Sequence, residues 1–241
     1  ASKEPFFGKI GLIRRLREVR CLAGFSRGKG LRTLDADLSG SKDWLPAMEA
    51  YGEGIYLELN TSKILKWQRE QEHQLNPIIE DLISRYEASF LSEYFDVELT
   101  PSFLLVHTLS HLLIRELTLN SGYPSSSLRE RIYSNASGQV ALLIYATDMD
   151  ASGTLGGLVE QGRPRSFWAT LQSAIRKAEW CSGDPVCREL THQGLASLNN
   201  SSCHCCSLVS ETSCVYSNVF LNRLFLIGSG ERQEPLGFFK T

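Results

Sequence analysis

The sequence predicts a mixed α/β fold, a helix-rich module with a small buried sheet and a zinc-stapled C-terminal segment. A near-continuous apolar run at 139–148 is typical of a fully buried strand. The stretch 100–122 opens with Thr100 as an N-cap and Pro101 in the first turn and closes on NSG, which predicts a long helix. Six of the seven cysteines fall within the last 61 residues, where few large apolar side chains are available to order the chain.

The first element is the stretch 9–22, in which apolar and basic residues recur at helical spacing. This predicts an amphipathic helix with a cationic face. The sequence GFSRGKG then ends the helix and adds charge in a loop. Such a surface is either a solvated face or a patch that contacts phosphate groups. Its basic residues are Lys9 and the nucleic-acid-binding candidates Arg14, Arg15, Arg17, Arg20, Arg27 and Lys29.

The following segments alternate between strands and helices. GEGIYLELN at 52–60 predicts a strand with a glycine-rich entry. The other predicted elements are helices at 61–73, 77–94, 100–122 and 125–133, a strand at 139–148, a glycine-rich loop that leads into a short helix, and an amphipathic helix at 164–180. The last helix delivers the chain directly to Cys181, so we expect it to support the cysteine-rich segment.

The cysteine-rich segment is the strongest chemical signal in the chain. Cys203 and Cys206 are separated by two residues, a spacing that lets one tight turn point both sulfurs at a single ion. A tetrahedral site needs two more ligands, and Cys181 and Cys187 form one candidate pair while Cys214 is a fifth candidate. The weaker alternatives are His192 and His204. One structural zinc is the leading interpretation, with disulfides, unliganded thiols or an iron–sulfur cluster as the alternatives.

His107 and His111 lie four residues apart on the predicted helix 100–122 and therefore share a face, which Arg115 extends. No HExxH pattern supplies a base for metal-assisted catalysis. The pair is interpreted either as core histidines satisfied by hydrogen bonds or as a site for phosphate or a carboxylate, with metal binding as the least favoured option.

Asp148 and Asp150 follow the predicted buried strand and precede the sequence GTLGG. Glycine loops after strand ends are common ligand sites in α/β proteins, but this loop matches neither nucleotide-binding pattern. The two carboxylates therefore either cap a turn or contribute to a site. Together with His107 and His111 they are the candidate catalytic residues of a phosphodiesterase-like or nucleotide-binding enzyme.

Composition and targeting signals limit the classes of protein further. The formal net charge of −2 does not indicate a globally basic nucleic-acid binder. No apolar run is long enough to cross a membrane, and no signal peptide is visible, so with an odd number of cysteines we expect a cytoplasmic protein. The chain begins at Ala1, which suggests processing or a longer parent protein. It has no helicase nucleotide motif, which excludes an autonomous motor.

Several stretches in order resemble the C-terminal part of the DrmB family of the DISARM anti-phage defence system. They include RLREVRCLAGFSR, HTLSHLLIREL, GYPSSSLRERIY, IYATDMDASGTLGGLVEQG, WCSGDPVC and CHCCSLVSETSC. The part from about residue 96 resembles the zinc-binding module of MrfA-type helicases (MZB domain). The resemblance implies a zinc-binding domain at 96–241 and a separate segment at 1–95 that continues an absent upstream region.

The resemblance also implies ligands, partners and a role. It places the zinc ligands at Cys181, Cys187, Cys203 and Cys206, with Cys214 as ligand or neighbour and Cys205 as a bystander. It implies a non-motor accessory subunit that assists a helicase partner, the DrmA-like ATPase, in binding and unwinding DNA, with the missing N-terminal region as a further possible chain. A pure protein–protein scaffold is the remaining alternative.

Overall fold

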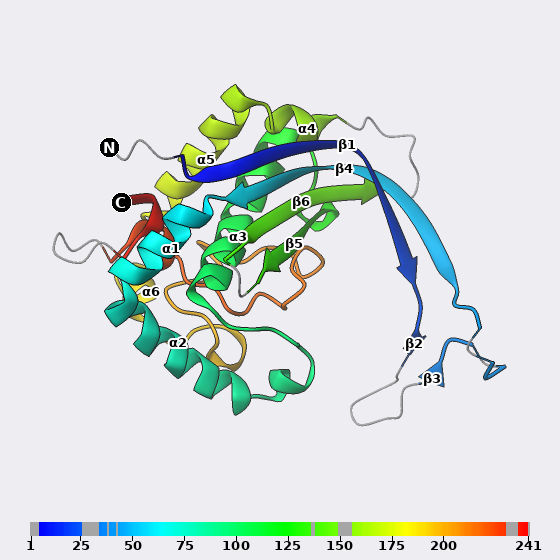
Figure 1. The fold of residues 1–241 in the computed structure, drawn as a ribbon, viewed down its shortest axis with the longest axis horizontal. Coiled ribbons are helices and arrows are strands. Elements are labelled where there is room, and N and C mark those ends of the chain that lie inside the picture. The colour runs from blue at the N-terminus through cyan, green and yellow to red at the C-terminus, as the bar shows by residue number, and fades with distance from the viewer. Residues whose placement is uncertain are drawn as a thin grey trace.

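The computed structural model describes residues 5–25, 34–37, 39–41, 43–135, 138–148, 156–229 and 236–240, with only the backbone of Asp148 and Lys240. Its centre is a four-stranded antiparallel sheet in the order β1-β4-β6-β5. The strands are β1 (Phe7–Cys21), β4 (Ala47–Leu59), β5 (Leu128–Ser134) and β6 (Val140–Asp148). Strands from both sides of the predicted boundary at 95/96 share this sheet. The predicted mixed α/β class is confirmed (Figure 1).

The prediction of a helix at 9–22 is wrong, because this segment is strand β1. It pairs with β4 from Phe7 opposite Leu59 to Cys21 opposite Ala47. Along β1 most side chains alternate between exposed and half-buried positions. Because the segment mixes apolar and basic residues, its sequence pattern fits the period of a strand as well as that of a helix. Pairing with a long, apolar partner strand overrides the local helical spacing.

The predicted helix at 125–133 is also wrong. Only Ser125–Ser127 form a 3₁₀ turn (η2), and the chain then enters β5. Pairing of β5 with β6 runs from Leu128 opposite Ala146 to Ser134 opposite Val140. The predicted strands at 52–60 and 139–148 are confirmed as parts of β4 and β6.

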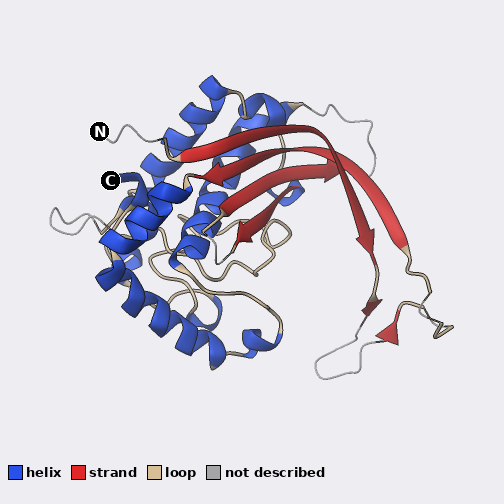
Figure 2. Ribbon diagram, viewed as in Figure 1, coloured by secondary structure: helices blue, strands red, loops and turns tan. Residues whose placement is uncertain are grey.

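Helices gather on one side of the sheet (Figure 2). They are α1 (Thr61–Glu70), α2 (Glu72–Glu87), α3 (Pro101–Ser121), α4 (Gly157–Gln161), α5 (Pro164–Ala178), α6 (Val186–Glu189) and α7 (Leu224–Ile227). Short 3₁₀ turns η1 (Phe90–Glu93), η3 (Leu195–Ser197) and η4 (Phe238–Lys240) complete the list. None of the described helices is both long enough and apolar enough for a membrane crossing.

Helix α3 is the axis of the core, and its predicted capping is confirmed. The Thr100 side chain accepts a hydrogen bond from the backbone N–H of Phe103 at 3.1 Å, and Gly122 ends the helix with a left-handed φ of 81°. Most of its residues are buried on all sides, against the sheet, α5 and α7. Polar side chains on α3 therefore have to find partners inside the protein.

A two-stranded arm leaves this body. Strand β6 pairs with β4 only between Tyr51 and Glu58, so β1 and β4 continue beyond it as a ribbon that ends in β2 (Gly24–Phe25) and β3 (Leu34–Asp35) (Figure 1). We call its described residues within 17–25 and 34–50 the arm. Its large apolar side chains are between 44% and 56% exposed. They are Val19, Leu22, Phe25, Leu34, Trp44, Leu45 and Met48.

Candidate metal centre

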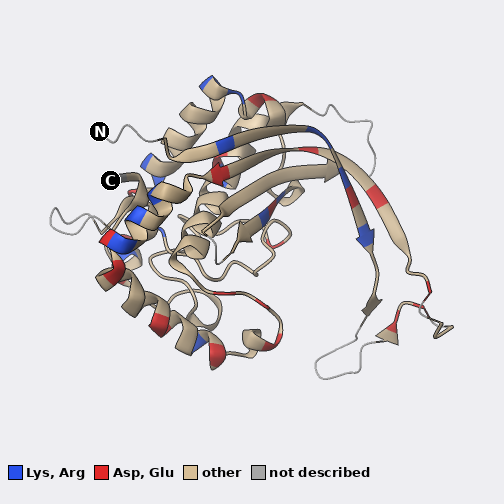
Figure 3. Ribbon diagram, viewed as in Figure 1, with Lys and Arg blue, Asp and Glu red and all other residues tan. Residues whose placement is uncertain are grey.

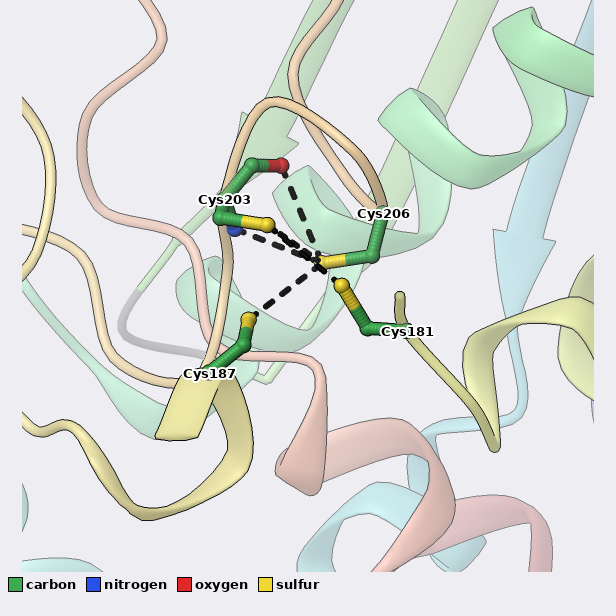
Figure 4. A group of neighbouring side chains, drawn as sticks. All are labelled: Cys181, Cys187, Cys203 and Cys206. Atoms are coloured by element: carbon green, nitrogen blue, oxygen red, sulfur yellow. Dashed lines mark hydrogen bonds between the residues drawn. The ribbon is translucent and has the colours of Figure 1, made fainter. Parts of the chain in front are cut away.

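Four cysteine side chains converge at the C-terminal end of α5 (Figure 4). Cys181 lies in the turn after α5, Cys187 lies on α6, and Cys203 and Cys206 share one tight turn. We call this group the four-cysteine centre. The predicted knuckle and the predicted upstream pair thus meet at one point.

The sulfur positions fit a tetrahedral ion. The Sγ–Sγ distances are 3.5 Å for Cys181–Cys203, 3.8 Å for Cys203–Cys206 and 3.9 Å for Cys187–Cys206. A tetrahedron with zinc–sulfur bonds of about 2.3 Å has edges of about 3.8 Å. No disulfide joins any of the seven cysteines, all of which lie in described residues. The donor set and its spacing are therefore those of a closed zinc site.

Hydrogen bonds to sulfur set the two turns. The backbone N–H of Gly183 donates to Cys181 Sγ at 3.4 Å, and the N–H of Cys203 donates to Cys206 Sγ at 3.3 Å. The hydroxyl of Ser207 donates to the same Cys206 sulfur at 3.3 Å. Donors aimed at sulfur favour the thiolate, which is the form that binds metal.

The ionisation of the thiols depends on their surroundings. Burial raises the pKa of Cys181 to about 11 and also raises the pKa of Cys187. Burial opposes ionisation of Cys203 too, but hydrogen bonds, chiefly from the backbone N–H of Cys206, outweigh it and lower its pKa to about 7. A bound dication overrides these values because coordination deprotonates a thiol outright.

One buried arginine, which the sequence did not single out, ties the two cysteine-bearing turns together. Arg223 forms an ion pair with Asp184, whose carboxylate also accepts the backbone N–H of Cys181 at 2.9 Å. Its guanidinium donates to the carbonyls of Ser201 at 2.8 Å and Ala178 at 3.0 Å. Arg223 thereby fixes the end of α5 beside the loop segment that leads to the knuckle.

Arg115 has a similar structural task from α3. Its guanidinium donates to the carbonyls of Cys205 at 2.7 Å and Leu208 at 2.8 Å, so it holds the knuckle turn from outside. The Cys205 side chain is exposed and outside the four-cysteine centre. The two weaker histidine candidates, His192 and His204, are exposed as well.

Cys214, the fifth candidate, lies elsewhere. Its sulfur is 3.3 Å from Nε2 of His107, in a second group with His111 and Glu130. We call this group the His–Glu–Cys cluster. Glu130 Oε1 lies 3.1 Å from His107 Nε2 and 3.4 Å from His111 Nε2. Glu130 was missed because its segment was predicted as a helix, which would not bring it to α3.

The structure does not bring the aspartate candidates to the histidines. Asp148 ends β6 opposite Tyr51, whereas Glu130 pairs with Ile144. Four residues of strand separate these positions by about 13 Å. Asp150 lies outside the described residues. A shared catalytic group of these four residues is thus not seen among the described atoms.

The arginine candidates of the N-terminal segment lie along β1 instead of on a helix. Arg14 and Arg15 are exposed, and the guanidinium of Arg15 lies 5.6 Å from the ring centroid of Tyr51. Arg27 and Lys29 fall outside the described residues. The exposed pair sits at a register shift between Ile13 and Leu16, which is why two neighbouring side chains are both accessible.

Acidic neighbours partly neutralise the remaining two arginines. Arg17 is paired with Glu49 across the arm. Arg20 is 2.5 Å from Glu18 and donates to Thr147 at 2.9 Å. Figure 3 accordingly shows both signs of charge along β1 and β4.

Comparisons with known proteins bear on the four-cysteine centre directly. Residues 109–207 match the family model of the MrfA Zn-binding domain, a segment that contains all four cysteines of the centre. The chain is also 36% identical over 236 residues to "DISARM protein DrmB" of Bacillus paralicheniformis, which covers 93% of this chain. It spans 41% of the length of that relative. The predicted resemblance and the predicted structural zinc are both confirmed.

Proposed function

Since the chain is a DrmB-like sequence built around an MrfA-type zinc centre, we propose that it acts as a non-motor accessory subunit of a helicase-containing anti-phage defence complex. The observation that most directly supports this proposal is the closed four-cysteine centre. Four protein ligands fill a tetrahedral site and leave no position for substrate or water, which is the pattern of structural zinc. The metal then serves to fix the segment 181–229 against α3 and α5.

The arm supports a protein partner. Seven large apolar side chains stand about half exposed on a ribbon that projects from the body, and such surfaces mark contacts with other proteins. The partner in this proposal is the DrmA-like ATPase, with the upstream part of a DrmB-like protein as a second chain. The motor activity belongs to that partner.

The open face of the sheet supports contact with DNA. Tyr56 on β4 and Tyr133 on β5 meet across the intervening strand β6, with ring centroids 6.3 Å apart, and Arg131 is exposed on the same face as Tyr133. Aromatic rings stack on bases, and arginines neutralise phosphates. This face is the DNA-contacting surface in the proposal, and Arg14 and Arg15, which are exposed on β1, are further phosphate contacts.

A pull-down with the purified ATPase tests the partner. The double variant Trp44→Asp, Met48→Asp on the arm is expected to weaken binding by more than about tenfold, because buried apolar anchors dominate interfaces. The control is Leu119→Asp, which changes a side chain that is 70% exposed at the end of α3. Equal binding by the arm variant and the wild type would contradict the arm interface.

A salt titration of DNA binding tests the second surface. The double variant Arg14→Glu, Arg15→Glu is expected to reduce the dependence of log affinity on log salt by about two, one for each lost phosphate contact. Lys66→Glu on α1, also exposed, is the matched control.

A protein–protein scaffold is the second candidate, favoured by the ion pairs that neutralise Arg17 and Arg20. It predicts intact ATPase binding and no change in DNA affinity for the Arg14, Arg15 variant. By contrast, no observation favours an enzyme that uses His107 and His111, since both side chains are fully buried beneath β5.

A further inference from the structure

The His–Glu–Cys cluster has the composition and geometry of a second metal site. His107 and His111 project from one face of α3, Glu130 reaches them from β5, and Cys214 comes from the loop after the knuckle. Both histidines and the carboxylate are 0% exposed, and the cysteine is 7% exposed. One ligand atom from each residue lies within 4.8 Å of all the others.

The protonation of His111 is fixed by its neighbour. Its Nδ1 lies 3.0 Å from the carbonyl oxygen of Ser207, which only accepts, so Nδ1 carries the proton. In the neutral ring, Nε2 then presents a lone pair. That lone pair faces Glu130 Oε1 at 3.4 Å, and Nε2 makes no hydrogen bond. Two acceptors thus face each other inside the protein, with a cation as the natural occupant between them.

His107 differs in which ring nitrogen is unpaired. Its Nε2 faces both Glu130 and Cys214, while its Nδ1 completes no hydrogen bond. In the described residues only three buried side-chain nitrogen or oxygen atoms lack a hydrogen-bond partner, and two of them belong to this histidine pair. Buried polar atoms are rarely left unpaired without a reason.

We propose that the His–Glu–Cys cluster binds a second divalent transition metal ion, with zinc as the best match to its ligand types. The ligands are Nε2 of His107, Nε2 of His111, a carboxylate oxygen of Glu130 and Sγ of Cys214. Tetrahedral zinc with nitrogen and oxygen ligands has edges of about 3.3 Å, and slightly longer ones to sulfur. The 3.1 Å and 3.4 Å separations of Glu130 Oε1 from the two histidines lie on either side of this edge, and the 3.3 Å from His107 Nε2 to Cys214 Sγ is somewhat shorter than the edge to sulfur.

Charge and the surrounding contacts support the assignment. One carboxylate and one thiolate balance a dication, so the filled site is neutral, which suits a fully buried position. Ligating histidines usually donate their other ring N–H to a carbonyl, as His111 does to Ser207. The hydroxyl of Ser110 donates to the second oxygen of Glu130 and orients it. The matched family segment 109–207 contains neither His107 nor Cys214, so that match does not define this site.

Metal content of the purified full chain tests the proposal, and it does so independently of any defence role. Mass spectrometry that quantifies the transition metals from manganese to zinc is expected to find two metal ions per chain. His111→Ala and Cys214→Ala are each expected to lose one equivalent and keep the other, while Cys181→Ser loses the equivalent of the four-cysteine centre. His204→Ala and Cys205→Ser are the matched controls and keep both.

X-ray absorption on the wild type decides the question even where variants fail to fold. Two filled sites give five sulfur, two nitrogen and one oxygen ligand over two ions, whereas the four-cysteine centre alone gives four sulfurs on one ion. A single equivalent with an all-sulfur shell, after purification in zinc-supplemented medium, overturns the proposal. Retention of two equivalents in both His111→Ala and Cys214→Ala overturns it as well.

Discussion

The four-cysteine centre and the His–Glu–Cys cluster differ in how the chain builds them. The first comes from two short turns, with hydrogen bonds from the turns themselves to sulfur. The second combines a helix, a strand and a distant loop, and is sealed inside the core. The difference teaches that local spacing encodes one centre, whereas only the tertiary fold creates the other. Ser207 touches both, through its hydroxyl to Cys206 and its carbonyl to His111.

The largest expected effect comes from Cys203→Ser. Loss of one ligand is expected to release the zinc and lower the free energy of unfolding by more than about 3 kcal/mol, because structural zinc contributes on the order of 10 kcal/mol in small domains. Zinc content and thermal denaturation measure this. Cys205→Ser, two residues away and exposed, should behave as wild type. If both variants melt alike, the knuckle assignment fails.

Glu130→Gln gives the next largest effect. It removes the negative charge that faces both histidines, and removal of one partner from a buried charged group costs about 3–5 kcal/mol. Urea denaturation measures the change. Glu58→Gln on the open face of the same sheet is the control, since Glu58 is half-buried and accepts one hydrogen bond from Tyr56 at 3.2 Å. The control should lose less than about 1 kcal/mol of unfolding free energy. An equal loss in the two variants would contradict the expected difference between the buried and the half-buried carboxylate.

Ser207→Ala sharpens the comparison at the residue that the two groups share. The change deletes the hydroxyl that donates to Cys206 and keeps the carbonyl that accepts from His111. We expect the free energy of unfolding to fall by about 1 kcal/mol, and the four-cysteine centre to release its zinc faster to a chelator. The metal of the His–Glu–Cys cluster should be retained, and its selective loss would show that the two groups are not separable in this way.

Glu18→Gln is the smallest expected effect and serves as a reference outside both groups. Burial acts to raise the pKa of Glu18, but hydrogen bonds from Arg20, Thr147 and Tyr145 outweigh it and hold the pKa below its usual range. The stabilisation is therefore present above the unfolded-state pKa and is lost as the pH falls through the lowered value. The variant should lose less than about 1 kcal/mol of unfolding free energy at pH 7, and its stability should approach that of the wild type in acid. A stability difference between variant and wild type that widens in acid would contradict this pH dependence.

Features that depend on residues close together along the chain could be predicted from the sequence. Cys203 and Cys206 stand out because a two-residue spacing fits one ion, and α3 stands out because Thr100 and Gly122 cap it locally. The strand β1 could not be distinguished from a helix because its apolar and basic residues suit both periods, and only pairing with β4 decides between them.

The His–Glu–Cys cluster could not be predicted from the sequence for a related reason. His107 and His111 were recognised as one face of a helix, but their partner Glu130 lay in a segment predicted as helical. Once that segment is a strand, Glu130 alternates inward toward α3 while Arg131 points outward. Cys214 was recognised as a candidate ligand but grouped by proximity in sequence with the wrong neighbours in space.

The spacing of the ligands along the chain also bears on the order in which the two groups form. Cys181 and Cys203 are 22 residues apart, whereas His107 and Cys214 are 107 residues apart. The longer loop costs about 1.4 kcal/mol more chain entropy to close, on the logarithmic scale of loop closure. It also needs β5 in place against α3 before its donors meet. We therefore expect the four-cysteine turns to fold first around their ion, and the His–Glu–Cys cluster to close only when the loop that carries Cys214 has returned to α3.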